Sequence, residues 1–169
     1  MFSRANLMLR QACESDLPGL IVCDTYAQVH PARAHELLLW VQQQSCYVAV
    51  SLNEPVGFVI LQYTFFSNGF IPLVCVAEAR QRQGVGEFLL MQAEQLCTTP
   101  KLFTSTNASN LRAQRLFARA GFVPSGIVEN LDEADPELIY FKALLQASET
   151  ANPSVKGTSS KPDAPYIER

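Results

Sequence analysis

The organisation of this 169-residue chain follows from one stretch, Val76-Ala77-Glu78-Ala79-Arg80-Gln81-Arg82-Gln83-Gly84-Val85-Gly86. An apolar run that is expected to form a buried strand ends where this stretch begins. After it, apolar residues recur at three- and four-residue spacing over 85–96, which predicts a helix with one buried face. A helix N-terminus carries unpaired N–H groups and about half a positive charge. The stretch therefore predicts a strand, a turn suited to phosphate, and a helix.

The glycines and arginines of this turn suit it to binding an anion. Gly84 and Gly86 let the backbone approach a ligand where a Cβ would intrude, and Arg80 and Arg82 add positive charge, so a diphosphate fits. The alternative is a strand-to-helix turn that needs glycine for its geometry alone. Two other phosphate motifs fail, because Leu89 stands where G-x-G-x-x-G requires a third glycine and no Gly-Lys-Ser/Thr is present.

The remaining elements follow from apolar patterning and turn residues. Before the turn, strands are predicted over 7–11, 47–51, 57–63 and 70–76, with one helix capped by Ser15-Asp16 and another beginning near Pro31. After the helix over 85–96 come a strand over 102–106, a helix from Asn110 to Gly121, and strands over 122–128 and 138–144. This order defines an α/β layered domain, in which the three strands before the turn form an antiparallel meander.

Length and composition indicate one soluble globular domain. Hydrophobic residues make up 48% of the chain and charged residues 17%, and no apolar run is long enough to span a bilayer. The globular part is expected from about Leu7 to about Leu145, so that the domain covers residues 1–146. Residues 147–169, rich in Ser, Thr, Pro, Lys and Ala, are predicted to form a flexible C-terminal tail.

The net charge and the cysteine content indicate which partners and which cellular compartment to expect. The net charge of -3 gives no general attraction to nucleic acid or to an anionic membrane, so neither is expected as a partner. The five cysteines are scattered and form no C-x-x-C pair, which favours free thiols and a cytoplasmic location. No metal site is predicted, and the chain is expected to be a monomer or a homodimer.

Two motifs together carry a family resemblance. The first is Gln81-Arg82-Gln83-Gly84-Val85-Gly86. The second is Asn110-Leu111-Arg112-Ala113-Gln114-Arg115-Leu116-Phe117-Ala118-Arg119-Ala120-Gly121-Phe122. The first resembles the Q/R-x-x-G-x-G/A signature of the GNAT superfamily of N-acetyltransferases, and the second resembles that family's N-x-x-A-x-x-L-Y/F-x-x-x-G-F element. The motifs occur in the family's order and on the expected elements, so the pair is more specific than either half. The resemblance covers most of the globular part and is weakest over the first fifty residues.

This resemblance implies a GNAT-type mixed, mostly antiparallel central sheet that is flanked by helices and splayed at the acetyl-CoA site. It implies acetyl-CoA as cosubstrate and direct transfer of the acetyl group to a primary amine of a small molecule or peptide. Backbone amides of residues 81–86 would bind the CoA pyrophosphate. Backbone groups of Val74, Cys75 and Val76 would bind the pantetheine arm, with Asn110 on its other side. Arg119 would reach a CoA phosphate, or else be a solvated arginine on the helix surface.

Acetyl transfer from a thioester also needs an oxyanion site and a leaving thiolate. Lost oxyanion donors cost ~3–4 kcal/mol in other acyl transfers, and the resemblance implies a backbone donor at Cys75 or Val76. Phe117, which the resemblance places among the cofactor-binding residues, occupies the position where the family often has a tyrosine as general acid, and it has no proton to give. Tyr140 on the last strand is the predicted substitute, unless its ring only packs in the sheet. A thiol with a pKa near ~8.5 can also leave with limited help.

The acceptor amine, with a pKa near ~10.4, must lose a proton before it can attack. His30 and His35 lie in the region that forms one wall of the acceptor site in the family, and either is a candidate base or a surface histidine. The acidic loop over 129–137 would attract a cationic amine, or is a solvated hairpin. An acetyl-cysteine route through Cys75 is discounted, because a cysteine in an apolar strand is usually a small buried hydrophobe.

Two other functions stay open at this point. A catalytically silent acyl-CoA-binding regulatory module would explain Phe117 and the lack of an unambiguous base. A nucleotide-binding domain of another class would bind ATP or NAD in preference to CoA.

Overall fold

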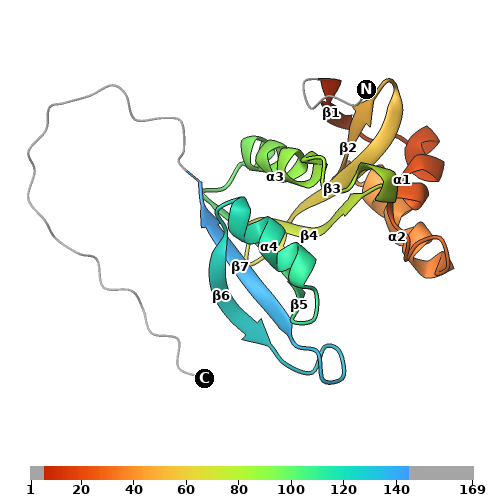
Figure 1. Ribbon diagram of the computed structural model, residues 1–169. Helices are drawn as coiled ribbons and strands as arrows, with labels where there is room; N and C mark the ends of the chain where they lie inside the picture. Colours follow the sequence, from red (N-terminus) through yellow and green to blue (C-terminus); the bar gives the residue numbers. More distant parts are fainter. Residues whose placement is uncertain (1–5, 145–169) are drawn as a thin grey trace, which may run out of the picture.

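The computed structural model describes residues 6–144, so the predicted tail over 147–169 lies outside the described residues. Seven strands form one sheet in the order β1-β2-β3-β4-β5-β7-β6 (Figure 1). The strands are β1 (Met8–Gln11), β2 (Cys46–Ser51), β3 (Glu54–Phe65), β4 (Asn68–Val76), β5 (Lys101–Asn107), β6 (Val123–Val128) and β7 (Glu137–Ala143). The helices are α1 (Leu17–Cys23), α2 (Pro31–Gln42), α3 (Val85–Leu96) and α4 (Leu111–Arg119), with short 3-10 helices at Glu14–Asp16 and Glu78–Arg80.

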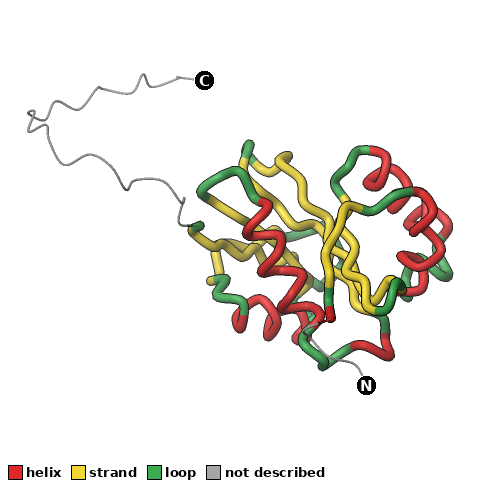
Figure 2. The backbone as a smooth tube through the Cα atoms, turned by 90° about the horizontal axis from the view of Figure 1, so that it is seen from above, coloured by secondary structure: helices red, strands yellow, loops and turns green. Residues whose placement is uncertain are grey.

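All neighbouring strands are antiparallel except β4 and β5, which are parallel. The predicted mostly antiparallel α/β architecture is therefore confirmed, including the meander from β2 to β4. Helices lie on both sides of the sheet (Figure 2). No described helix is both long enough and apolar enough to span a bilayer.

Alternating side chains divide the core into two parts. Phe58 and Ile60 of β3 pack with α1 and α2, through residues such as Leu20 and Leu37. Their neighbours Val59 and Leu61 belong to the second cluster, which packs with α3 and α4 on the opposite face. The sheet thus separates an α1–α2 layer from an α3–α4 layer.

The sheet splits between β4 and β5. The two strands pair only over residues 69–71 of β4 and 102–104 of β5. Beyond this point β4 stays paired with β3 as far as Val76, and β5 stays paired with β7 as far as Asn107. Pro72, which has no N–H to donate, follows directly on the last paired residue of β4. The predicted splay is therefore present at this position.

The ends of α4 follow their sequence signals. The side chain of Asn110 accepts a hydrogen bond from the backbone N of Ala113 at 3.1 Å, which caps the helix. Gly121 has φ +84 and lets the chain turn out of the helix. Both predicted ends of this helix are confirmed.

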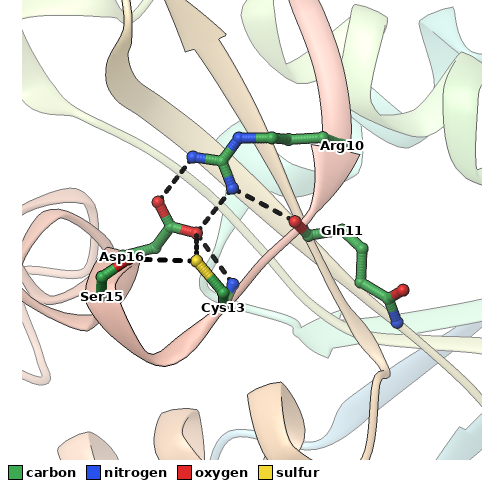
Figure 3. A network of polar contacts seen from close by, with 5 residues as sticks. All are labelled: Arg10, Gln11, Cys13, Ser15 and Asp16. Carbon is green, nitrogen blue, oxygen red and sulfur yellow. Dashed lines mark hydrogen bonds and ion pairs between the residues drawn. The ribbon is translucent and has the colours of Figure 1, made fainter.

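The entry to α1 differs from its prediction. Asp16 occupies the N-cap position, but its side chain does not cap the helix. Its carboxylate instead accepts hydrogen bonds from both terminal nitrogens of Arg10, each at 2.7 Å, and from the backbone N of Cys13 at 2.9 Å (Figure 3). The Arg10 guanidinium holds the pKa of the buried Asp16 carboxyl well below its usual range. The carboxylate thus ties β1 to the turn before α1.

We expect Asp16→Asn to lower the free energy of unfolding at pH 7 by about 2 kcal/mol. Because the folded-state pKa of Asp16 is depressed, its contribution is complete above the unfolded value near ~3.9 and is lost as the pH falls below it. Urea unfolding at several pH values should show a steeper loss of stability in the wild type than in the variant. Glu133→Gln, at an exposed site, serves as the control. Equal unfolding midpoints for the wild type and Asp16→Asn would contradict the account.

Candidate functional site

A cleft of about 630 Å³ opens where β4 and β5 separate. Its walls come from four parts of the chain: the turn and the start of α3, the end of β4, the start and outer turns of α4, and the end of α1. The lining residues are Arg80, Gln81, Arg82, Gly84, Gly86 and Glu87; Val74, Cys75 and Val76; Asn110, Arg112, Ala113, Leu116 and Arg119; and Cys23, Asp24 and Thr25. Since α1 and α4 lie on opposite faces of the sheet, the cleft is lined from both layers.

The turn before α3 contains two residues with left-handed backbone. Arg82 and Gly84 adopt left-handed conformations, with φ of +60 and +83 respectively. Gly84 is the N-cap residue of α3, and its carbonyl accepts the first intrahelical bond from the N of Phe88 at 3.0 Å. The amides of the first helical turn lack intrahelical acceptors by the geometry of any α-helix. They are the groups this turn can offer to an anion.

A glycine is needed at position 86 for helix packing as well as for the predicted approach of a ligand. A Cβ at Gly86 would lie 3.1 Å from Cδ2 of Leu116 on α4. The glycine therefore allows α4 to approach the start of α3, and this approach places one wall of the cleft.

Other side chains of the motif brace the turn. Nε2 of Gln81 donates to the carbonyl of Val76 at 3.2 Å, and Nε2 of Gln83 donates to the carbonyl of Ala79 at 2.9 Å. The side chain of Val85 is buried in the core on the α3–α4 face. Gln81 lines the cleft, whereas Gln83 and Val85 do not. These contacts hold the turn in place, while the amides of the first turn of α3 remain without intrahelical acceptors.

The ladder between β3 and β4 decides which amides of β4 face the gap. The N of Ala77 donates to the carbonyl of Val56 at 3.0 Å. Bonded and non-bonded pairs alternate along an antiparallel ladder, and no irregularity interrupts this part of it. The N–H of Cys75 therefore points to β3, while the N–H groups of Val74 and Val76 point toward the gap. Of the two predicted oxyanion donors, only Val76 has an amide with this orientation.

Charge in the cleft is opposite in sign to the charge of the whole chain. Four arginines line it, Arg80, Arg82, Arg112 and Arg119, against the two carboxylates of Asp24 and Glu87. Nε of Arg119 lies 3.0 Å from Oε1 of Glu87, so this pair bridges α4 and α3 at the wall of the cleft. In a protein of net charge -3, this concentration of arginine favours an anionic ligand.

The end of α1 supplies part of the site that the sequence did not predict. Oδ1 of Asp24 accepts hydrogen bonds from the backbone N of Tyr26 at 3.0 Å and of Ala27 at 3.3 Å. Its Oδ2 lies 3.8 Å from Nε of Arg33, and neither atom has a hydrogen-bond partner within residues 6–144. The side chain of Asp24 is only 7% exposed. The carboxylate of Asp24 at this end of the cleft is therefore fixed by backbone N–H groups, and its negative charge has no hydrogen bond from Arg33.

The two cysteines that line the cleft are poor nucleophiles. Burial raises the pKa of the Cys23 thiol to about 11 and raises that of the Cys75 thiol further above its ordinary value. Both remain protonated near neutral pH, and the thiolate is the reactive form. An acetyl-cysteine intermediate is therefore not favoured at either residue.

Phe117 and Tyr140 lie outside the cleft. Both rings are buried in the core on the α3–α4 face, with centroids 5.5 Å apart. Neither residue lines the cleft, and Tyr140 instead borders a shallow hollow between α4 and β6. The position of Tyr140 gives no support to its predicted role as general acid, because strand alternation turns its side chain into the core beneath α4.

The other predicted acid–base groups also lie outside the cleft. The ring of His30 stacks on Tyr26 with centroids 3.8 Å apart, and neither His30 nor His35 is among the lining residues. In the acidic loop, the carboxylate of Asp135 accepts hydrogen bonds from the N and Oγ of Ser109, at 2.9 and 2.6 Å. That loop therefore braces the connection between β5 and α4.

We expect Tyr140→Phe to leave the acetyl transfer that the family resemblance implies unchanged within about two-fold, since the hydroxyl does not reach the cleft. Steady-state rates with a fixed amine and varied acetyl-CoA measure this. Tyr140→Ala, which removes the packed ring, should lower stability by about 3 kcal/mol. A ten-fold or larger fall in the turnover number of Tyr140→Phe, with binding unchanged, would restore the tyrosine as a proton donor.

Comparisons with known proteins agree with this geometry. The family model described as "Acetyltransferase (GNAT) family" matches residues 17–122. A GNAT-family acetyltransferase from Bacillus cereus ATCC 10987 is 31% identical, with a TM-score of 0.77 over 83% of this chain and 99% of that one. No curated protein matches the chain significantly. The fold and its split sheet are those of an acyltransferase, and the chain belongs to the GNAT acetyltransferase family.

Two further solved structures share the fold at lower identity. The ribosomal-protein-S18-alanine N-acetyltransferase from Escherichia coli is 19% identical, with a TM-score of 0.69 over 86% of this chain and 99% of that one. YncA from Salmonella typhimurium, solved with its cofactor acetyl-CoA, is 14% identical, with a TM-score of 0.66 over 86% of this chain and 98% of that one.

Proposed function

We propose that this protein is an acetyl-CoA-dependent N-acetyltransferase that moves an acetyl group directly to a primary amine of a small molecule or peptide. One observation carries the proposal: an arginine-rich cleft joins the N-terminus of α3 to the gap between β4 and β5. Membership of the GNAT family supports it, as do the acetyl-CoA complex of YncA and the amine specificity in the name of the Escherichia coli enzyme.

Acetyl-CoA would enter by its phosphates. The amides from Gln81 to Gly86 would bind the pyrophosphate at the positive end of α3. Arg82 and Arg112 would add charge from the two walls, while Arg119 would exchange its contact with Glu87 for a phosphate oxygen. These groups would bind and orient the cosubstrate and would take no part in the transfer of the acetyl group.

The pantetheine arm would then lie in the gap along β4. The N–H groups of Val74 and Val76 point into this gap, and Asn110 lines its other side. A backbone N–H aimed at the thioester oxygen would stabilise the negative charge that develops there during attack, a contribution of ~3–4 kcal/mol. Of the predicted donors Cys75 and Val76, Val76 has the N–H that points into the gap. The N–H of Val74 has the same orientation and is a second candidate.

Asp24 would receive the proton of the incoming ammonium, directly or through a water molecule. Among the described residues that line the cleft, the carboxylates are Asp24 and Glu87, and Glu87 is engaged by Arg119 at the α3 end. Proton transfer from R–NH3+ to the carboxylate leaves R–NH2, whose lone pair attacks the thioester carbon. The C–N bond forms and the C–S bond breaks. The second amine proton passes to the departing thiolate, giving the amide and free CoA thiol.

The leaving step needs no tyrosine in this scheme. Phe117 stands at the family's tyrosine position, and its ring lies in the core. A thiol with a pKa near ~8.5 leaves as thiolate without a strong acid, and the amine nitrogen itself supplies the proton. The catalytically silent module is not favoured, because the family model that matches residues 17–122 is one of acetyltransferases.

Calorimetry and a thiol-release assay test the proposal together. Binding of acetyl-CoA, with release of CoA thiol in the presence of at least one amine from a library of small amines and peptides, is the expected result. Tight binding without turnover on any amine would favour the silent module. A preference for ATP or NAD over CoA would overturn both.

We also propose that the protein acts in the cytoplasm. All five cysteines are free thiols, and three of them lie beside the cleft or in the core. Free thiols of this kind persist in a reducing compartment. Fractionation of cells that produce the protein would test this.

A further inference from the structure

Five phenylalanines form a continuous row of rings at one end of the sheet. We call this row the open aromatic face; it consists of Phe65, Phe66, Phe70, Phe103 and Phe141. The ring of Phe65 lies 5.0, 5.1 and 5.0 Å from those of Phe66, Phe70 and Phe103, and Phe103 lies 5.2 Å from Phe141. Phe66 is 85% exposed, and the other four are half-buried.

Strand alternation explains why the rings of Phe103 and Phe141, at one end of this row, point away from α3 and α4. Leu102 and Tyr140 are buried in the core on the α3–α4 face, so their neighbours Phe103 and Phe141 point to the other face. On that face α1 and α2 pack against β2 and β3. Figure 1 shows these two helices at the β1–β3 end of the sheet, away from β5, β7 and β6. Among the described elements, no helix covers the open aromatic face.

The size of this surface suits a homodimer. A fully buried aromatic side chain buries ~150–250 Å², so Phe66 and the four half-buried rings leave on the order of 300–400 Å² exposed. Val123 of β6 is 53% exposed and pairs with Phe141, which extends the apolar surface to the edge strand. A standard interface buries ~800 Å² per partner, of which ~65% is apolar in homodimers, or ~500 Å². The open aromatic face and the β6 edge together approach this apolar area.

We infer that the open aromatic face is the contact between two copies of this chain, related by a two-fold axis so that the same surface meets itself. An apolar patch of this size is often functional on a soluble protein. The acceptor is not the occupant, because none of the five phenylalanines lines the cleft. Residues 145–169 suit the face less well, since their 25 residues include only four large apolar side chains, Leu145, Val155, Tyr166 and Ile167.

Sedimentation velocity of the full chain over roughly 1–100 µM tests the inference. The wild type should sediment as a dimer, twice the 18.7 kDa of the chain. Phe66→Glu should weaken the dimer at least ten-fold, because it places a charge in an apolar contact. Leu52→Glu is the matched control, since Leu52 is 82% exposed in the turn between β2 and β3, away from the face, and it should not change the dimer. Thermal unfolding of both variants checks that they fold.

Three results would overturn the inference. The wild type could remain a monomer at every concentration. A dimer could survive Phe66→Glu in folded protein, which would place the contact elsewhere. A chain ending at Leu144 could form dimers through this face while the full chain stays a monomer, which would make residues 145–169 its occupant.

Discussion

Gly84→Asp should weaken acetyl-CoA binding by at least about 100-fold, or ~2.7 kcal/mol. Two effects combine at this position. Gly84 has φ +83, a conformation that costs a side-chain-bearing residue strain, and it is the N-cap of α3. An aspartate there would place an anion at the helix N-terminus, where the proposed site holds a diphosphate of the same sign. Titration calorimetry with acetyl-CoA measures the change.

Two controls separate charge from shape in this experiment. Gly84→Asn has almost the same shape without the charge, and asparagine tolerates left-handed backbone, so its loss should be no more than about ten-fold. Gly126→Asp introduces the same carboxylate in β6, where an added Cβ meets none of the described residues within 4 Å, and it should bind like the wild type. If Gly84→Asp folds and binds acetyl-CoA with unchanged affinity, the assignment of this turn is wrong.

Asp24→Asn should lower kcat/KM for the amine by at least about 100-fold near pH 7, the usual contribution of a general base. Asparagine can still accept the hydrogen bonds from the N of Tyr26 and Ala27, so the turn after α1 should keep its shape. The affinity for acetyl-CoA should change by less than about two-fold, because the phosphates would lie at the other end of the cleft.

The pH dependence gives this prediction a second readout. Above the pKa of a free alkylamine, near ~10.4, the acceptor is already deprotonated, so the defect of Asp24→Asn should shrink as the pH approaches that value. Glu36→Gln is the matched control: it changes an exposed carboxylate 3.2 Å from Arg33 that does not line the cleft. If the Asp24→Asn variant turns over at the wild-type rate across this pH range, Asp24 is not the general base.

Most of the fold could be predicted because its signals are local. The apolar spacing over 85–96 specifies α3 without reference to the rest of the chain, and α3 spans Val85–Leu96. Pro31 begins α2, and Asn110 and Gly121 mark the ends of α4 through their own backbone and side-chain chemistry. The parallel pairing of β4 with β5 was predictable only through the family resemblance.

The parts of the site that depend on distant contacts could not be predicted from local sequence. Asp24 reaches the cleft because α1 packs on β3, and its place in the sequence carries no motif. The choice between Cys75 and Val76 as amide donor depends on the ladder bond from Ala77 to Val56. Alternation predicts that Leu138 and Tyr140 share a face of the last strand, but not that α4 covers this face. Arg112, at a variable position of the second motif, had no signal of its own.

A crystal structure of the protein with CoA bound would locate the cosubstrate directly. We expect the pyrophosphate within hydrogen-bond distance of backbone amides between Gln81 and Gly86, and the pantetheine arm between β4 and β5 beside Val74 and Val76. A pyrophosphate bound away from the start of α3, or an arm lying outside the gap between the two strands, would contradict this expectation.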